Sequence, residues 1–197
     1  MSANSRYEIL PGLLLGFHGT DAKIAERVLA GHEHLTPSKN DYDWLGHGIY
    51  LWEYSPQRAE DFARQSAKEP KITKGKIETP AVVGVIIDPG LCLNMLEASA
   101  LEQAALAYEA LASNHPDKLP SNKGGADLRQ RHLDCAVLQM LHTIRAAENL
   151  PSYDTVRGAF WEGDPIYPNA GFRAKNHVQI CIRNTDCIKG YFRVISE

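Results

Sequence analysis

Short apolar runs alternate with helical patterns over the first third of the chain. An apolar run over residues 13–18 predicts a strand, and Thr20-Asp21 then supplies an N-cap for a helix of about ten residues. The polar stretch from His32 to Trp44 indicates a loop, and residues 48–52 predict a second strand. Ser55-Pro56 begins a second helix, because proline is favoured in the first helical turn. The expected buried stripe of that helix consists of Ala59, Phe62 and Ala63.

The middle of the chain is predicted to be mainly helical. The apolar run from Ala81 to Asp88 is stopped by Pro89-Gly90 and predicts a central strand. Two helical stretches follow at residues 93–113 and 126–148, with a turn-rich loop between them. We therefore expect a helical insertion over about residues 93–149.

The C-terminal part returns to strands. Residues 151–175 hold many turn formers and few periodic apolar positions, which indicates irregular structure. Alternation over residues 178–183 predicts a strand with Gln179 on one face, and a last strand is expected over residues 188–195. The whole pattern predicts one α+β domain over residues 1–197, a length that can bury a proper core.

Composition narrows the class of protein. The hydrophobic share of 44% and the charged share of 23% are ordinary for a soluble globular domain. A net charge of −3 does not indicate general binding to nucleic acid or to anionic membranes, although a local basic patch stays open. Neither a signal peptide nor an apolar run of roughly 18 residues is present, so we expect a cytoplasmic protein with no membrane span. The four cysteines lack metal-ligand spacing, which predicts free thiols and no metal site.

Two short motifs combine a strand pattern with glycine and a polar ring. Phe17-His18-Gly19-Thr20 ends the first apolar run, and Gly46-His47-Gly48-Ile49-Tyr50-Leu51 opens the second strand. Gly19 allows the backbone to approach a neighbour or a ligand closely. The ring of Tyr50, beside small residues, can line a flat slot.

Together these motifs resemble the first two signature motifs of the ADP-ribosyltransferases of the diphtheria toxin and poly(ADP-ribose) polymerase type. In that family His-Gly-Ser/Thr opens the NAD site, and a Gly-x-Gly-Ile-Tyr strand follows. The third signature residue, usually Glu, lies on a strand near the C-terminus, and Gln179 within residues 177–182 holds the matching place. The resemblance covers residues 13–65 and 172–195, and it implies a split β-sheet with an NAD cleft. Gln in place of Glu favours mono-ADP-ribosylation over chain elongation.

The resemblance also implies roles for single residues. Transfer from NAD breaks the nicotinamide–ribose bond through an oxocarbenium-like state, so the site must hold both riboses and the ring. His18 is expected to bind the adenosine-side ribose, and the backbone of Gly19 the nicotinamide amide, with the Thr20 hydroxyl beside them. Tyr50 is expected to stack on nicotinamide, and Gln179 to orient the nicotinamide-side ribose. The alternative is structural: a core histidine, a core aromatic residue and a solvent-facing strand residue.

Two further roles are less tightly assigned. The family places a second aromatic residue on the helix after Gly-Ile-Tyr, for which Phe62, one place away, and Tyr54 are the candidates. An amide such as that of Gln179 cannot act as a general base. Glu162, Asp164 and His177 are the candidates for activating the acceptor.

The loop over residues 159–172 combines four aromatic residues with Gly, Pro and acidic residues. Its place before the Gln179 strand implies acceptor recognition, by stacking on a base, a ring or an arginine. Arg173, Lys175 and Arg183 add a small positive group that can meet a phosphate. Alternatively, the aromatic residues hold this loop down over the core.

Three functions therefore stay open. The first is a mono-ADP-ribosyltransferase that uses NAD to modify RNA, DNA or protein, as a toxin or phage-defence effector held in check by an antitoxin or another inhibitor protein. The second is an NAD glycohydrolase, in which water is the acceptor. The third is a non-catalytic module that binds NAD or ADP-ribose.

Overall fold

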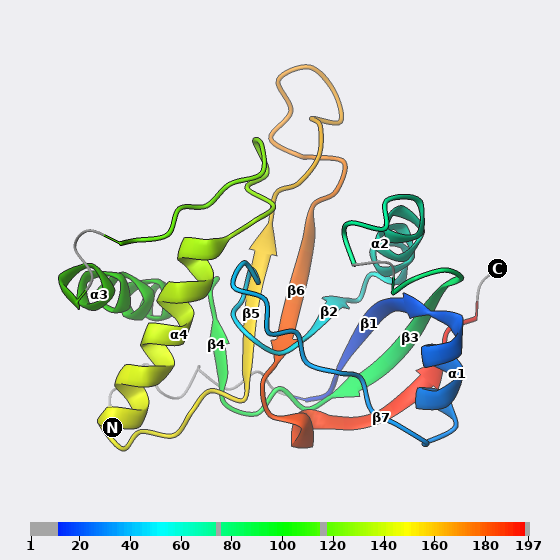
Figure 1. The fold of residues 1–197 in the computed structure, drawn as a ribbon, viewed down its shortest axis with the longest axis horizontal. Coiled ribbons are helices and arrows are strands. Elements are labelled where there is room, and N and C mark those ends of the chain that lie inside the picture. Colours follow the sequence, from blue (N-terminus) through cyan, green and yellow to red (C-terminus); the bar gives the residue numbers. More distant parts are fainter. Residues whose placement is uncertain (1–11, 74–75, 115–117, 196–197) are drawn as a thin grey trace.

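The computed structural model describes residues 12–73, 76–114 and 118–195. Over these residues the chain forms a seven-stranded sheet and four α-helices in a mixed α+β arrangement (Figure 1). The strands are β1 (Leu14–Asp21), β2 (Ile49–Glu53), β3 (Pro80–Ile87), β4 (Cys92–Asn94), β5 (Thr155–Phe160), β6 (His177–Ile182) and β7 (Ile188–Arg193). The helices are α1 (Ala22–Leu29), α2 (Pro56–Lys68), α3 (Ala98–Asn114) and α4 (His132–Ala147). The strand order is β4-β5-β6-β2-β1-β3-β7, antiparallel except for the pair β4–β5.

The N-terminal elements confirm the sequence pattern. Asp21 caps α1, since its side chain accepts a hydrogen bond from the Lys23 backbone N–H at 3.0 Å. Pro56 occupies the start of α2. β1 runs three residues further than expected, to Asp21, because it pairs with β3 all the way to Pro80.

The middle of the chain corrects the predicted helical insertion. Residues 92–94 form β4, which pairs with β5, so α3 begins only at Ala98 and α4 only at His132. β5 itself lies inside residues 151–175, which were expected to be irregular. Gly158 and flanking turn formers hide this strand in the sequence, whereas pairing with β6 over six residues stabilises it in the fold.

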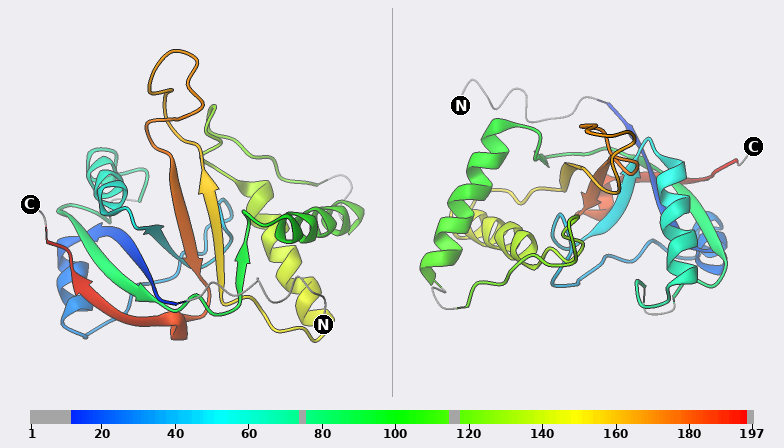
Figure 2. Two further views of the ribbon diagram at one scale, coloured as in Figure 1. Left: turned by 180° about the vertical axis from the view of Figure 1, so that it is seen from behind. Right: turned by 90° about the horizontal axis from the view of Figure 1, so that it is seen from above.

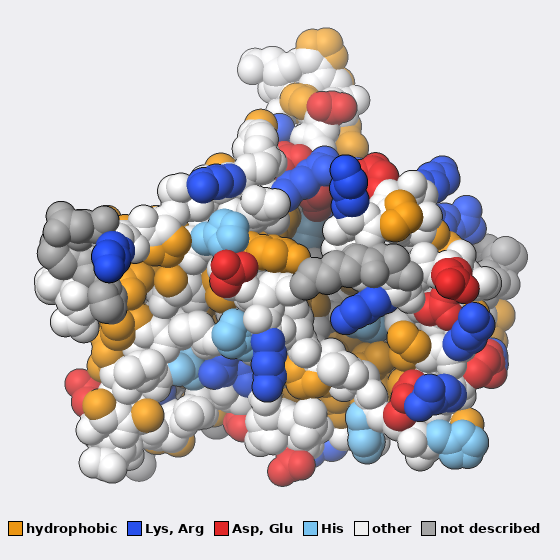
Figure 3. Space-filling view, viewed as in Figure 1, with side chains coloured by type: hydrophobic (Ala, Val, Ile, Leu, Met, Phe, Trp, Pro, Cys, Tyr) orange, Lys and Arg blue, Asp and Glu red, His pale blue; other side chains and the backbone are white. Residues whose placement is uncertain are grey.

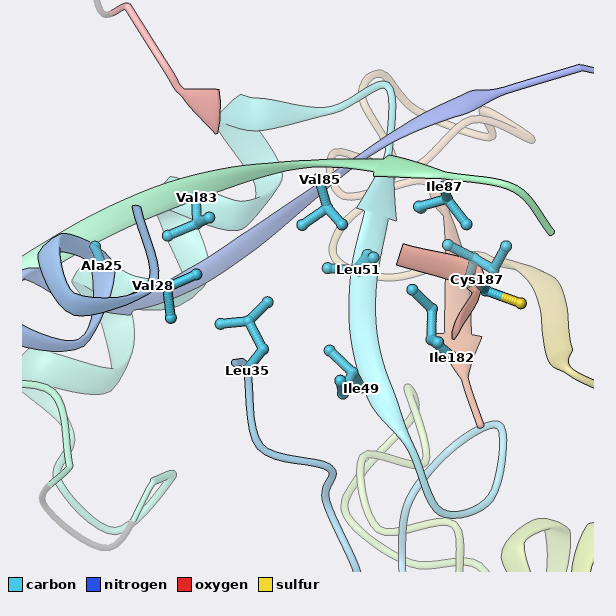
Figure 4. Packing of buried hydrophobic residues seen from close by; sticks show 11 residues of the cluster. Ala25, Val28, Leu35, Ile49, Leu51, Val83, Val85, Ile87, Ile182 and Cys187 are labelled. Carbon is cyan, nitrogen blue, oxygen red and sulfur yellow. The ribbon is translucent and has the colours of Figure 1, made fainter. Parts of the chain in front are cut away.

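Hydrophobic clusters cover both faces of the sheet. Directly opposed residues of antiparallel strands share a face, so the register sorts the side chains. One face packs on α1, and Figure 4 shows its core close up. Its buried members include Ala25, Val28, Leu35, Ile49, Leu51, Val83, Val85, Ile87, Ile180 and Ile182.

The opposite face is covered by three helices. α3 and α4 pack on β5 and β6 through a cluster that includes Leu138, Leu141 and Val156. α2 packs on β1 and β2 through Ala59, with Phe17 and Trp52 beneath it. Figures 1 and 2 show α3 and α4 towards the β4–β5 edge and α2 towards β1, with the ends of β5 and β6 between them.

The ladder between β1 and β2 is short. The two strands pair only at Gly16↔Glu53 and Phe17↔Trp52, although β1 pairs with β3 at all eight of its residues. β2 instead continues along β6, where Tyr50 lies opposite Cys181. β1 and β2 therefore part directly before His18.

An arginine on β5 links this strand to β2 and to β4. Arg157 on β5 donates to both carboxylate oxygens of Glu53 on β2, at 2.6 and 2.9 Å, and to Asn94 on β4 at 3.2 Å. The Glu53 side chain is only 10% exposed. Arg157 thereby links β4 and β5, on one side of β6, to β2 on the other side.

Candidate functional site

His18 lies at the point where β1 leaves β2. Its Nδ1 donates to the backbone oxygen of Tyr50 at 2.8 Å, which bridges the parted strands. Burial lowers the pKa of the His18 ring, so the ring is neutral at neutral pH. A neutral imidazole that donates through Nδ1 keeps a lone pair on Nε2, and no hydrogen bond occupies that nitrogen in the described part of the chain.

Tyr50 is tied to the loop that precedes it. Its hydroxyl donates to the backbone oxygen of Gly46 at 2.6 Å and accepts from the backbone N–H of Leu45 at 2.7 Å. The ring packs against the cluster under α4 and stays partly exposed, while burial raises the pKa of the hydroxyl. These two hydrogen bonds hold the Tyr50 ring against the loop.

Gln179 lies in the middle of β6, between Trp52 on β2 and Gly158 on β5. The residue is 8% exposed, and no hydrogen bond of its side-chain amide is present among the described residues. An amide in such a place has donors and an acceptor to offer to a ligand or to water.

The three motif residues do not line one wall. Because opposed residues share a face, Tyr50, Trp52 and Gln179 face the side of α2 and α4. His18, opposite Val83, belongs by register to the α1 face. The His18–Tyr50 hydrogen bond thus joins a side chain of the α1 face to the backbone of a residue whose side chain lies on the opposite face.

The neighbours of His18 have structural duties. A side chain on Gly19 would put its Cβ 2.2 Å from the backbone oxygen of Ala59, so glycine lets α2 lie directly on β1. Thr20 is 5% exposed and pairs with Ala81.

Phe62 on α2 packs on Trp52, with ring centroids 5.1 Å apart. Phe62 therefore lies on the same side as Gln179, whereas Tyr54 is largely exposed after β2.

A group of aromatic and charged side chains that the sequence motifs do not bring together surrounds His177, at the start of β6. Its ring lies near Trp44, Trp52 and Phe160, with centroids 6.3, 6.4 and 5.5 Å away. Nδ1 of His177 donates to the backbone oxygen of Lys175 at 2.7 Å. Burial lowers the pKa of this ring as well, with nearby arginines adding to the effect.

Two arginines and one carboxylate complete this cluster, which we call the His177 cluster (Trp44, Trp52, Arg58, Arg131, Phe160, Glu162, His177). Arg58 on α2 donates to Glu162 Oε2 at 3.1 Å. The side chains of Arg58 and Glu162 are largely buried, at 13% and 15% exposed. The guanidinium of Arg131 lies over the rings of Trp44 and Phe160, at 4.4 and 5.1 Å.

Buried polar atoms without a partner gather in the His177 cluster. Among the described residues, Trp52 Nε1, Arg58 Nε, Arg131 Nε and His177 Nε2 are buried and make no hydrogen bond. Such atoms cost free energy unless a ligand or water pairs with them. The sequence offered one faint signal, since all three tryptophans of the chain lie in or beside this cluster.

Other predicted site residues lie elsewhere. Asp164 is exposed, and only its backbone oxygen is engaged, by Ala174. Arg183 lies at the opposite end of β6 from Lys175 and donates to the backbone oxygen of His47, so the expected positive group is divided. His47 in turn accepts a hydrogen bond from Gln139 on α4.

The loop after β5 projects from the molecule (Figures 1 and 2). Phe160 is buried, but Trp161, Tyr167 and Phe172 are 60%, 55% and 63% exposed. These three rings do not hold the loop down on the core, which corrects that alternative. Figure 3 shows basic and acidic side chains gathered at the base of the projection.

A cavity of about 620 Å³ opens between α3, α4 and the end of β5. Its walls are mainly apolar, with Arg131 and Asp134 as charged members. Gly158 and Phe160 of β5 and Trp161, directly after β5, also line it. None of His18, Tyr50 and Gln179 lines it.

The described ranges hold neither a metal-site grouping nor a membrane-spanning helix. In residues 12–73, 76–114 and 118–195, no three His, Cys, Asp or Glu side chains come together as a metal site. None of the helices in these ranges has the length and apolar character that crossing a membrane requires.

Comparison with known proteins gives little. No protein-family model matches the chain. An uncharacterized protein of Methanocaldococcus jannaschii is 49% identical over 37 residues, which is 19% of this chain and 17% of that protein. The crystal structure of an anti-CRISPR protein is similar over 94% of this chain and 98% of that chain, at 11% identity and a TM-score of 0.36. A likeness at this level transfers neither fold family nor activity.

Proposed function

We propose that this chain is a mono-ADP-ribosyltransferase of the diphtheria toxin and poly(ADP-ribose) polymerase-like type. It transfers ADP-ribose from NAD to a macromolecular acceptor and releases nicotinamide. The observation that carries the proposal is the His18 Nδ1–Tyr50 O hydrogen bond of 2.8 Å, which joins the first two motifs across the parted strands. It leaves His18 Nε2 as an acceptor for a ribose hydroxyl.

The strand order supports the same assignment. β1, β2 and β6, which carry His18, Tyr50 and Gln179, are neighbours in the sheet although Gln179 is far away in the sequence. The short β1–β2 ladder is the feature that we equate with a split sheet.

The proposal places NAD where β1 and β2 part. NAD has two riboses joined by a diphosphate, and the proposal requires one molecule to contact His18 with one ribose and Gln179 with the other. In this proposal His18 binds the adenosine-side ribose, and Gln179 binds the nicotinamide-side ribose. Tyr50 and Phe62 offer ring faces to nicotinamide, and the exposed rings of loop 159–172 contact the acceptor.

The first prediction concerns His18. With NAD labelled in its adenylate phosphate and a cell lysate as acceptor source, His18→Ala is expected to reduce labelling by about 10²-fold or more, because a ribose contact is lost. His32→Ala, an exposed histidine on the same part of the chain, is the matched control and should label like wild type. Thermal melting of all three proteins checks that the fold is kept.

The labelled product separates the candidate functions. Label on RNA, DNA or a protein band, absent with His18→Ala, supports transfer and names the acceptor class. Free ADP-ribose alone identifies an NAD glycohydrolase. A wild-type protein that consumes no NAD, or a His18→Ala protein that labels equally well, contradicts the proposal. A toxin or defence role stays a prediction, which growth arrest on expression, relieved by His18→Ala, tests. An inhibitor partner also stays a prediction.

A further inference from the structure

Gln179 leaves the proposed transfer without a proton acceptor, because an amide is not a base at neutral pH. We propose that Glu162 is the general base that activates the acceptor. The inference rests on the proposed function and adds a catalytic residue to it. It starts from the His177 cluster rather than from the three motifs.

Glu162 is held near His177, at the start of β6. It lies two residues beyond Phe160, the last residue of β5, and Arg58 of α2 donates to its Oε2 at 3.1 Å. The same oxygen lies 3.9 Å from Nδ1 of His177. His177 precedes Gln179 by two residues on β6, so the two share a face at a separation of about 7 Å along the strand.

One carboxylate oxygen remains free. Arg58 occupies Oε2, whereas no hydrogen bond engages Oε1 of Glu162 among the described residues. The side chain is 15% exposed, so a ligand can reach it without unfolding of the cluster. A carboxylate fixed at one oxygen and open at the other is suited to take a proton in a defined direction.

Structural stability does not account for this arrangement. A largely buried ion pair contributes little net stability, since desolvation of both charges offsets their attraction. Here Nε of Arg58 is additionally buried without a partner. The geometry therefore favours a role for the Arg58–Glu162 pair in contacting a ligand over a role in stability.

The other two candidate bases fit less well. Nδ1–H of His177 is already donated to the Lys175 backbone, and its Nε2 is shut off from solvent. Asp164 is exposed in the projecting loop, and its carboxylate is not held by any described residue. Glu162 alone combines a fixed position with an open oxygen.

The proposed step balances as follows for an acceptor X–H, where X is oxygen or nitrogen. The proton of X–H passes to Oε1 of Glu162, and the electron pair of X forms a bond to the anomeric carbon of the nicotinamide-side ribose. The bond from that carbon to nicotinamide breaks, and its electron pair neutralises the ring nitrogen. Glu162 then returns the proton to solvent.

Room for the acceptor adjoins this position. The cavity between α3, α4 and β5 is lined by Phe160, Trp161 and Arg131, and Glu162 directly follows Trp161. Gly158, which lies opposite Gln179 on β5, lines the same cavity. Its apolar walls can hold the part of the acceptor that does not react.

The test uses etheno-NAD, whose fluorescence rises when nicotinamide is released, with the same cell lysate as acceptor source and the rate of lysate alone subtracted. Glu162→Gln keeps an oxygen for Arg58 and is expected to lower kcat by about 10²-fold or more, with KM changed less than threefold or so. Asp164→Asn, the same change two residues along the chain, is the matched control and should keep the wild-type rate. Glu162→Asp retains a carboxylate and should keep more of the wild-type rate than Glu162→Gln does.

Azide distinguishes a base from a positioning residue. Azide attacks without losing a proton, so sodium azide is expected to restore cleavage by Glu162→Gln at least about tenfold, and not by His18→Ala. An active wild type with an equally active Glu162→Gln, or no rescue by azide, overturns the role of Glu162 and leaves the proposed function standing. A wild type that cleaves no NAD overturns both.

Discussion

At the scale of single residues, three histidines are held in the same state. His18, His142 and His177 each donate through Nδ1 to a backbone oxygen, and burial lowers the pKa of each ring. All three are therefore neutral at neutral pH, with a lone pair left on Nε2. At His18 this lone pair serves the proposed ribose contact, whereas at His142 it is buried without a partner among the described residues.

His142 gives a prediction for stability against pH. Burial lowers the pKa of its ring from 6.5 to about 4. Between pH 6.5 and 4, His142 binds a proton in the unfolded chain but stays neutral in the native chain. The contribution of neutral His142 to the free energy of unfolding is therefore complete above pH 6.5 and is lost as the pH falls towards 4. The loss is about 3 kcal/mol at most, from 1.36 kcal/mol per pKa unit.

His142→Phe removes this titration and keeps an aromatic ring beside Tyr153. Urea unfolding at a series of pH values should show a flatter fall in the free energy of unfolding for this variant than for wild type. Parallel curves for the two proteins between pH 6.5 and 4 would exclude a buried neutral His142.

At the scale of elements, the contact of α2 with β1 positions the proposed site. α2 carries Arg58 and Phe62, and it can lie on β1 only because residue 19 has no side chain. The sequence motif suggests a backbone contact to NAD for Gly19. The structure adds a packing reason for the same glycine.

Gly19→Ala is expected to push α2 away from β1, because its Cβ would lie 2.2 Å from a backbone oxygen. Overpacking of this kind costs about 1–3 kcal/mol, and the displaced helix should also weaken NAD cleavage. Urea unfolding followed by tryptophan fluorescence measures the first effect. Gly171→Ala, with no atom within 4 Å of the new Cβ, is the control and should change stability by less than about 0.5 kcal/mol. Equal stability of the two variants would contradict the close packing.

At the scale of the whole molecule, all four cysteines are buried free thiols. They lie on both sides of the sheet and at its edge, at Cys92, Cys135, Cys181 and Cys187. Burial raises the pKa of Cys135 and of Cys187 to about 11, and it raises that of Cys181 further. This agrees with the free thiols expected from their spacing.

The native protein should therefore react slowly with a thiol reagent such as DTNB, and all four thiols should react after unfolding in guanidinium chloride. The melting temperature should be the same with and without a reductant, because no crosslink is present among these cysteines. A thiol that reacts rapidly in the folded protein would show that the packing on its face of the sheet opens readily.

The sequence by itself determined the elements whose signals are local. The Asp21 cap, Pro56 at the start of α2 and the alternation around Gln179 each depend on neighbours within a few residues. The two glycine motifs likewise identified the strands that carry His18 and Tyr50. The roles of these residues with NAD are predictions, which the His18→Ala experiment tests.

Only the tertiary structure decided the rest. β4 and β5 are strands because partners from distant segments complete their hydrogen bonds, against a local pattern of helix and turn formers. The His177 cluster joins Arg58, Arg131 and Glu162 from three separate segments of the chain, and no spacing in the sequence relates them. Burial then fixed which polar atoms lost water without gaining a partner, and burial is a property of the packed molecule rather than of any segment.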